Sequence, residues 1–243
     1  MLENLSFTKK RIDRQARKFK NRGLTILCNN CIGGIILHDL KHEFNTPTIN
    51  LYFHAPDYVA FLERLDYYLL REITFSNASK YDTDVKSYPV GKIEDIEMHF
   101  VHYNSFEEAK QKWETRAKRV NYDNMFIIGS DKGYFTPDIL ERFLRLPFKN
   151  KIFFSSKPHI ANEVLFFREY LNQKEVADMI AHDHAWNYYF DVVKWLNTGE
   201  IKRYFFKTNL FNIYRFIREK CQIINRSQEK YERARSKELS NVH

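Results

Sequence analysis

The stretch Leu24-Thr25-Ile26-Leu27-Cys28-Asn29-Asn30-Cys31-Ile32-Gly33-Gly34 decides the fold that we predict for this chain. It joins a short apolar run to a second apolar stretch, which continues to Leu40, through a polar turn followed by two glycines. This order predicts a strand, a tight turn and a helix. It places Cys31 at or near the N-terminus of the helix, where backbone N–H groups and the helix dipole favour a thiolate.

Apolar runs with the spacing of strands and of helices continue to alternate over about the next 120 residues. The predicted strands are residues 24–28, 48–53, 96–103, 124–129 and 151–154. The predicted helices are residues 31–42, 55–69, 106–120 and 137–146. Strands that alternate with helices form parallel sheets with helices on both faces. We therefore predict an α/β fold with a mostly parallel sheet.

The 243 residues suit one large domain with appendages. We expect four segments: a basic lead-in (1–23), the α/β domain (24–160), a helical extension packed on it (161–224) and a charged tail (225–243). Three cysteines do not make a disulfide scaffold. No apolar run has the length of a signal peptide core or a membrane span, so we expect a cytoplasmic protein.

The net charge of +8 is concentrated at the two ends of the chain. Residues 1–23 carry a net +6 and residues 201–243 a net +7, which leaves residues 24–200 at −5. Basic ends suit an anionic surface, either a membrane or a nucleic acid. Since nothing in the chain resembles a named nucleic-acid module, we favour peripheral contact with the inner face of a membrane.

The candidate site follows from the rule that α/β sheets bind ligands at the carboxyl ends of their strands. Cys31 follows the first predicted strand, and His102 lies at the end of the third. A thiol and an imidazole form a nucleophile–base pair, so we predict that these two residues are catalytic. The side chains of Asn29 and Asn30 would donate hydrogen bonds to an oxyanion.

Four further residues would bind substrate. Gly33 and Gly34 let another molecule approach the backbone closely. Asp131 follows the buried strand 124–129, and the guanidinium of Arg116 suits a phosphate or carboxylate group. We predict no metal ion at this site.

Other interpretations of the same residues remain open: a structural role, a redox motif or a zinc site. Cys31 in a glycine-packed strand–helix corner is also typical of a buried structural cysteine. The Cys28-Asn-Asn-Cys31 pattern matches a thioredoxin-like redox motif. Cys28, Cys31, His38 and His42 have paired spacings like those of zinc ligands, although the gap between the pairs is short for a zinc finger.

The chain also resembles a known family. The stretches that carry the resemblance, in order, are NNCIGGIILHDL, FNTPTINLYF, SYPVG, DIEMHFVHY, SFEEAKQKWETRAKRVN, NMFII and LPFKNKIFF. They resemble a bacterial family of unknown function that is encoded in capsule and exopolysaccharide biosynthesis clusters. The resemblance covers about residues 24–160 and implies a pathway.

A weaker resemblance concerns the turn itself. Asn30-Cys31 is similar to the Asn-Cys of a Gly-Asn-Cys-Gln turn in polysaccharide acyltransferases, although position 29 is Asn and position 32 is Ile. This similarity implies an SGNH-hydrolase-like sheet as an alternative to a Rossmann-like one. It also implies acyl transfer from an acyl-coenzyme A donor to a sugar nucleotide or lipid-linked saccharide.

We therefore expect a transferase of capsule or exopolysaccharide biosynthesis, with acyl transfer as the reaction. A glycosyltransferase or sugar-phosphate transferase that uses Asp131 and Arg116 is the alternative within the same pathway. A third hypothesis is a non-catalytic, membrane-associated assembly protein that binds through its basic ends.

Overall fold

A computed structural model describes residues 2–82, 84, 86–176 and 184–217. The chain divides into two units, residues 1–202 and residues 203–243, which are described separately. The charged tail predicted at 225–243 lies outside the described residues, as do positions 177–183 and 218–224 of the predicted helical extension.

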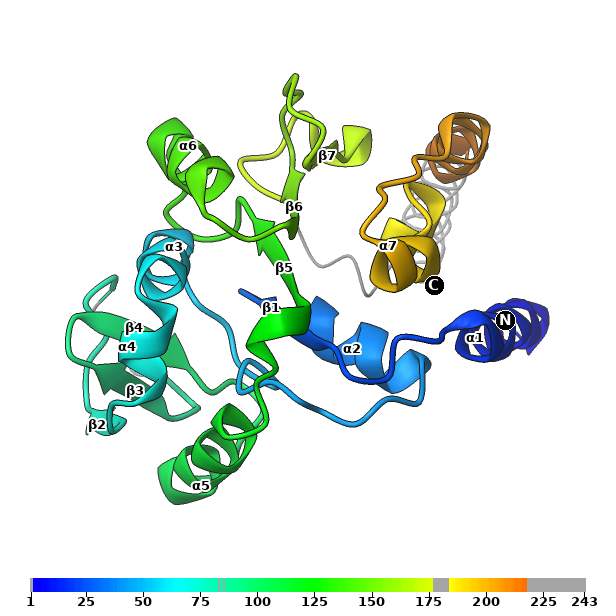
Figure 1. Ribbon diagram of the computed structural model, residues 1–243. Helices are drawn as coiled ribbons and strands as arrows, with labels where there is room; N and C mark the ends of the chain where they lie inside the picture. Colours follow the sequence, from blue (N-terminus) through cyan, green and yellow to red (C-terminus); the bar gives the residue numbers. More distant parts are fainter. Residues whose placement is uncertain (1, 83, 85, 177–183, 218–243) are drawn as a thin grey trace, which may run out of the picture. The chain divides into compact units, whose positions relative to one another are not determined.

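The centre of the first unit is a four-stranded parallel sheet with the order β1-β5-β6-β7 (Figure 1). Its strands are β1 (Thr25–Cys28), β5 (Met125–Ser130), β6 (Asn150–Ser155) and β7 (Val164–Phe166). All four residues of β1 are buried, as expected for a strand covered on both faces. The predicted parallel sheet is therefore confirmed. β7 lies in the part of the chain where we predicted only helices, so that prediction was wrong there. A strand of three residues is too short to show the alternation that identifies a strand in a sequence.

A second, antiparallel sheet contains a strand that we expected in the first. Its strands are β2 (Thr74–Ser76), β3 (Val90–Ile93) and β4 (Ile96–His99), in that order. The predicted strand 96–103 thus ends at His99 and pairs with β3 across a two-residue turn. Glu94 in this turn adopts the left-handed conformation typical of tight hairpins (φ 55°). The predicted strand 48–53 is reduced to a single bridge between Tyr52 and His99.

The helices of the first unit include those that cover the two faces of the parallel sheet. They are α1 (Leu2–Lys18), α2 (Ile32–Asp39), α3 (Ala55–Glu63), α4 (Leu65–Leu69), α5 (Phe106–Ala117), α6 (Pro137–Arg145) and α7 (Val192–Thr198). Short 3-10 turns lie at Tyr122–Asn124, Arg168–Tyr170 and Ala185–Tyr188. α3 and α6 lie on one face, and α2 and α7 on the other (Figure 1). None of the described helices is long and apolar enough to cross a bilayer.

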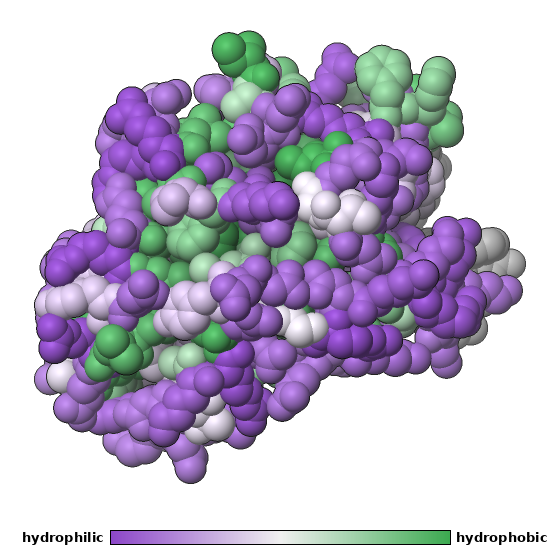
Figure 2. Space-filling model, in the orientation of Figure 1, coloured by the Kyte–Doolittle hydropathy of each residue, from purple (hydrophilic) through white to green (hydrophobic). Residues whose placement is uncertain are grey.

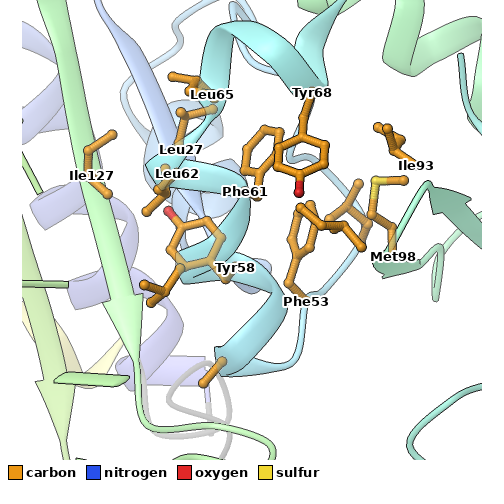
Figure 3. Packing of buried hydrophobic residues seen from close by; sticks show 14 of the residues in the cluster. Leu27, Phe53, Tyr58, Phe61, Leu62, Leu65, Tyr68, Ile93, Met98 and Ile127 are labelled. Carbon is orange, nitrogen blue, oxygen red and sulfur yellow. The ribbon is translucent and has the colours of Figure 1, made fainter. Parts of the chain in front are cut away.

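α3 lies between the two sheets and fills the space between them (Figure 3). Tyr58 points toward Leu27 and Ile127 of the parallel sheet, whereas Phe61 lies on the side of Met98 in β4. All five side chains are at most 1% exposed, so their burial supplies much of the hydrophobic stabilisation. Outside this core, the face drawn in Figure 2 is mainly hydrophilic, with smaller hydrophobic areas between the polar side chains.

Hydrogen bonds tie the two ends of the first unit together. The Asn197 side chain accepts from the backbone N–H of Lys20 (2.9 Å) and donates to the carbonyl oxygen of Lys18 (3.0 Å). The side-chain amide of Asn21 donates a hydrogen bond to the carbonyl oxygen of Leu196 (2.8 Å). The chain just before β1 is thereby held against the end of α7.

Candidate functional site

The predicted strand–turn–helix is present, with Cys31 immediately before α2. The side-chain oxygen of Asn30 accepts from the backbone N–H of Ile32 (3.0 Å) and from the thiol of Cys28 (3.2 Å). A Cβ at position 33 would lie 2.8 Å from the Cβ of Cys28, so only glycine lets α2 approach β1 this closely. The glycine predicted to admit a substrate therefore packs against the strand.

Asn29, Asn30 and Ser130 form a polar network that joins the ends of β1 and β5. Asn29 Nδ2 donates to the carbonyl oxygen of Ser130 (3.2 Å), and the Ser130 hydroxyl donates back to Asn29 Oδ1 (3.1 Å). Asn30 Nδ2 donates to the same hydroxyl (3.2 Å). The two asparagines thus brace the carboxyl edge of the sheet, where ligand sites of α/β folds lie.

The two cysteines of this turn lie in different environments. Cys28 is completely buried, and this burial raises the pKa of its thiol to about 12. Cys31 is half-buried, and neither residue is in a disulfide. Since thiolates are the reactive species, burial makes Cys28 the poorer nucleophile, and Cys31 is the more accessible thiol of the pair.

Tyr103 connects this corner to Arg116. The guanidinium of Arg116 donates to the Tyr103 hydroxyl (2.7 Å), which in turn donates to the carbonyl oxygen of Ile49 (3.0 Å). Burial raises the pKa of Tyr103, Arg116 opposes the rise, and Cys31 adds a smaller raising contribution. The thiol therefore lies within electrostatic range of the Tyr103 hydroxyl.

Arg116 opens onto a surface pocket of about 440 Å³. The pocket is lined by His42, Glu43, Phe44, Gln111, Lys112, Thr115, Arg116 and Arg119. Its three cationic side chains outnumber its one carboxylate, which pairs with Arg119 (2.9 Å). The Arg116 guanidinium lies 5.6 Å from the centre of the Phe44 ring. A positive pocket with a fixed guanidinium suits a phosphate or carboxylate group.

His102 lies elsewhere than predicted, because the strand before it belongs to the antiparallel sheet. Its side chain is exposed on the turn after β4, and its backbone N–H donates to the carbonyl oxygen of Asn50 (3.4 Å). Among the described residues, its imidazole has no hydrogen-bond partner. His102 is the residue before Tyr103, whose hydroxyl accepts from Arg116.

Asp131 lies at the predicted edge, but both of its carboxylate oxygens are occupied. One accepts from the backbone N–H of Ser156 (2.6 Å) and the other from that of Val176 (2.7 Å). The side chain is 1% exposed, and burial raises its pKa against the effect of these donors. Asp131 therefore organises two loops.

A buried polar cluster on β4 was not predicted from the sequence. Glu97 and His99 are both 0% exposed, and the His99 Nε2 atom lies 2.8 Å from the Glu97 carboxylate. Glu97 also accepts from Ser79 Oγ (2.5 Å) and the backbone N–H of Lys80 (2.8 Å). The Tyr88 hydroxyl lies 3.4 Å from the other ring nitrogen of His99. Residues two apart on a strand share a face, so the Glu97–His99 spacing was the available signal.

His54 lies beside this cluster and is surrounded by aromatic rings. It is 7% exposed, with Tyr81, His99 and Tyr52 at centroid distances of 4.1, 4.9 and 5.1 Å. Its Nε2 atom lies 3.3 Å from the Tyr52 hydroxyl, whereas Nδ1 has no hydrogen-bond partner and faces Gly133. Burial lowers the pKa of His54 to about 4, and the nearby His99 adds to this effect. The ring is therefore neutral at physiological pH.

His42, one of the four residues considered as zinc ligands, has no ring nitrogen left for a metal ion. Both ring nitrogens of His42 lie 2.6 Å from backbone carbonyl oxygens, those of Glu43 and Arg22. Among the residues that the structure describes, no group of three His, Cys, Asp or Glu side chains could hold a metal ion.

The fold and the site define an α/β protein with a cysteine-bearing turn at the carboxyl edge of a parallel sheet. The model of the domain of unknown function DUF1919 matches residues 3–197, so the chain belongs to that family. An uncharacterized protein of Haemophilus influenzae is 41% identical over 187 residues, which cover 74% of this chain and 87% of the relative. The predicted resemblance to a family of unknown function is thereby confirmed.

Proposed function

We propose that this protein is a transferase of bacterial surface-polysaccharide assembly, and that it transfers an acyl group from a coenzyme A thioester to a sugar. Cys31 is the nucleophile of this proposal. The acceptor is a hydroxyl group of a sugar nucleotide or of a lipid-linked saccharide. The polysaccharide pathway rests on the sequence resemblance described above.

The position of Cys31 carries the proposal. Its half-buried thiol immediately precedes α2, at the edge where the ends of β1 and β5 meet. A helix N-terminus favours the thiolate, and the carboxyl edge of the sheet is the usual ligand site. The partner cysteine of the turn is buried with a raised pKa, which favours one-thiol chemistry over a redox pair.

The reaction divides into two steps that each conserve atoms and charge. In the first, Cys31 passes its proton to a base, its sulfur bonds to the acyl carbon, and coenzyme A leaves as a thiol after taking up a proton. In the second, the sugar hydroxyl gives its proton to the base and bonds to the acyl carbon, and the Cys31 thiolate leaves. His102, next to Tyr103, is the proposed base, and the amide of Asn30 would lie nearest the oxyanion.

The positive pocket supports a phosphate-bearing substrate. Both coenzyme A and sugar nucleotides carry a diphosphate, and a guanidinium pairs with phosphate through two parallel hydrogen bonds. Arg116 borders the pocket and contacts the tyrosine that lies within electrostatic range of Cys31. The pocket would hold the diphosphate while the acyl or sugar end reaches the thiol.

The same pocket is the observation that favours a second candidate, glycosyl or sugar-phosphate transfer. That reaction also needs a bound diphosphate, and in our hypothesis it uses Asp131 and Arg116. The two backbone donors on Asp131 count against its acting on a substrate. We therefore rank this candidate below acyl transfer.

The test is an acceptor-free half reaction on the full chain carrying Cys221→Ser. Incubation with acetyl-coenzyme A should add one acetyl group to Cys31, located by peptide mass spectrometry, and should release coenzyme A. The matched control is Cys28→Ala, which removes a thiol three residues away that the structure buries. Cys28→Ala should retain the acetylation, and Cys31→Ala should abolish it.

Alkylation gives a second measure of the same thiol. At pH 7, iodoacetamide should modify Cys31 and spare Cys28 in the folded protein. Release of coenzyme A by Cys31→Ala at the unsubstituted rate would exclude the covalent mechanism. An unreactive Cys31, together with binding of UDP-glucose that Arg116→Met abolishes, would move sugar transfer to first place.

A further inference from the structure

The second unit contains a helix whose composition differs from the rest of the chain. Residues 205–217 are helical. The stretch 201–217 contains four cations and no Asp or Glu. A run with one sign of charge and many aromatic side chains is unusual for a helix that faces only water.

Large apolar side chains on this helix are exposed. They are Phe205, Phe206, Leu210, Ile213, Tyr214, Phe216 and Ile217, and their exposed fractions range from 53% to 81%. Elsewhere in the described chain, six exposed large hydrophobic residues are scattered over about two hundred positions. Such a concentration marks an interaction surface, since single exposed apolar residues are normal but contiguous ones are not.

The exposed apolar side chains form one face. At about 100° per residue, the seven fall within roughly half of the helix circumference, from Phe205 to Tyr214, and Asn209 lies among them. Lys207 and Arg215 lie in the other half, on either side of Phe211, which is buried. The helix thus has a wide, exposed apolar face, and its other side carries two cations and one buried aromatic residue.

We propose that the helix 205–217 docks flat on an anionic lipid bilayer, with its apolar face in the headgroup–acyl boundary. An amphipathic helix with aromatic and aliphatic residues on one face and cations on the other binds such interfaces. Anionic headgroups attract the basic residues, and no acidic residue in 201–217 opposes this attraction. A helix of this length spans about 20 Å and lies along the surface instead of crossing it.

Charge favours lipid over a second copy of the chain. The stretch 201–217 carries four cations and no acidic residue, so two copies of it repel one another and neither supplies a counter-charge to the other. Anionic lipid supplies the missing counter-charge from many headgroups at once. The proposal is independent of the reaction at Cys31.

The experiment is co-sedimentation of the full chain with vesicles of phosphatidylglycerol and phosphatidylcholine, against phosphatidylcholine alone. We expect binding to the anionic vesicles that falls as salt is raised. Leu210→Glu should abolish it, whereas Leu70→Glu and Ile160→Glu, at residues 85% and 100% exposed outside the helix, should leave it unchanged. Lys207→Glu should weaken binding about thirtyfold, since each charge near the surface is worth about 1 kcal/mol and reversal changes the charge by two. Lys118→Glu is its matched control.

A gain-of-signal variant guards against loss of folding. Phe206→Trp keeps an aromatic residue on the apolar face, and its emission should shift to shorter wavelength when anionic vesicles are added. No shift and no sedimentation would overturn the proposal. Equal loss of binding in Leu70→Glu and Leu210→Glu would overturn it too, as would a dimer that forms through this face without vesicle binding.

Discussion

The buried imidazole of His54 makes the stability of the fold depend on pH in a way that can be calculated. Burial, with help from His99, lowers its pKa from 6.5 to about 4. The unfolded chain therefore takes up a proton below pH 6.5, whereas the folded chain does so only near pH 4. The neutral ring contributes stability that is complete above pH 6.5 and is lost as the pH falls toward 4.

The size of this effect follows from the two pKa values. The full difference between 6.5 and 4 corresponds to about 3 kcal/mol, of which about 2 kcal/mol is lost at pH 5. His54→Gln removes the titrating group and keeps a polar side chain of moderate size. The gap in free energy of unfolding between wild type and variant should thus shrink by about 2 kcal/mol between pH 7.5 and pH 5.

Urea unfolding at the two pH values, followed by circular dichroism, measures that gap. His99, whose pKa is also lowered by burial, and Asp57 and Asp131, whose pKa values burial raises, are present in both proteins, so their effects largely cancel. His102→Gln, on an exposed turn, controls for the replacement and should unfold within about 0.5 kcal/mol of wild type at pH 7.5. A gap that is the same at both pH values would refute the idea that folding buries a neutral His54.

Three further predictions concern stability at neutral pH. Gly129→Ala should cost about 1–3 kcal/mol in urea unfolding, because the new Cβ would lie 2.6 Å from the ring of Phe153; a neutral result would mean that the ring moves aside. Asp131→Asn should cost about 2 kcal/mol by the same measurement, because an amide has one acceptor oxygen for two buried backbone donors; unchanged stability would contradict the role given to Asp131. Asn197→Ala should speed amide hydrogen exchange at Lys20, whose N–H it accepts, and equal exchange in wild type and variant would show that this bond does not hold the N-terminal segment.

Local features of the fold were predictable from the sequence. The apolar run, the Asn-rich turn and the two glycines at 24–34 predicted β1, the turn and α2 because strand, turn and helix signals there are short-range. The helix predicted from residue 106 does begin there as α5, and the side chain of Ser105 caps it by accepting from the backbone N–H of Glu108 (3.1 Å).

Long-range pairing was not predictable. The alternation in 96–103 indicated a strand but not its partner, and the hairpin turn Glu94-Asp95 lacks the Gly or Asn that usually marks one. The position of Asp131 at the sheet edge was predicted correctly from the strand before it. The role of Asp131 was not predicted, because the backbone N–H groups that it accepts from belong to residues 156 and 176. A sequence pattern does not show which backbone N–H groups are left without a partner in secondary structure.

The direct pairing of β1 with β5 has a consequence for synthesis of the chain. About 100 residues separate the two strands, so at roughly 5–20 residues per second a ribosome needs about 5–20 s to deliver the partner of β1. Meanwhile β3 and β4, which are adjacent in sequence, can pair as they emerge. The nascent Thr25–Cys28 segment has no strand to pair with until β5 has been synthesised, and the hydrogen bonds between Asn29 and Ser130 can form only then. The cysteine-bearing turn is consequently a late product of translation, exposed to proteases and chaperones while the middle of the chain is still being made.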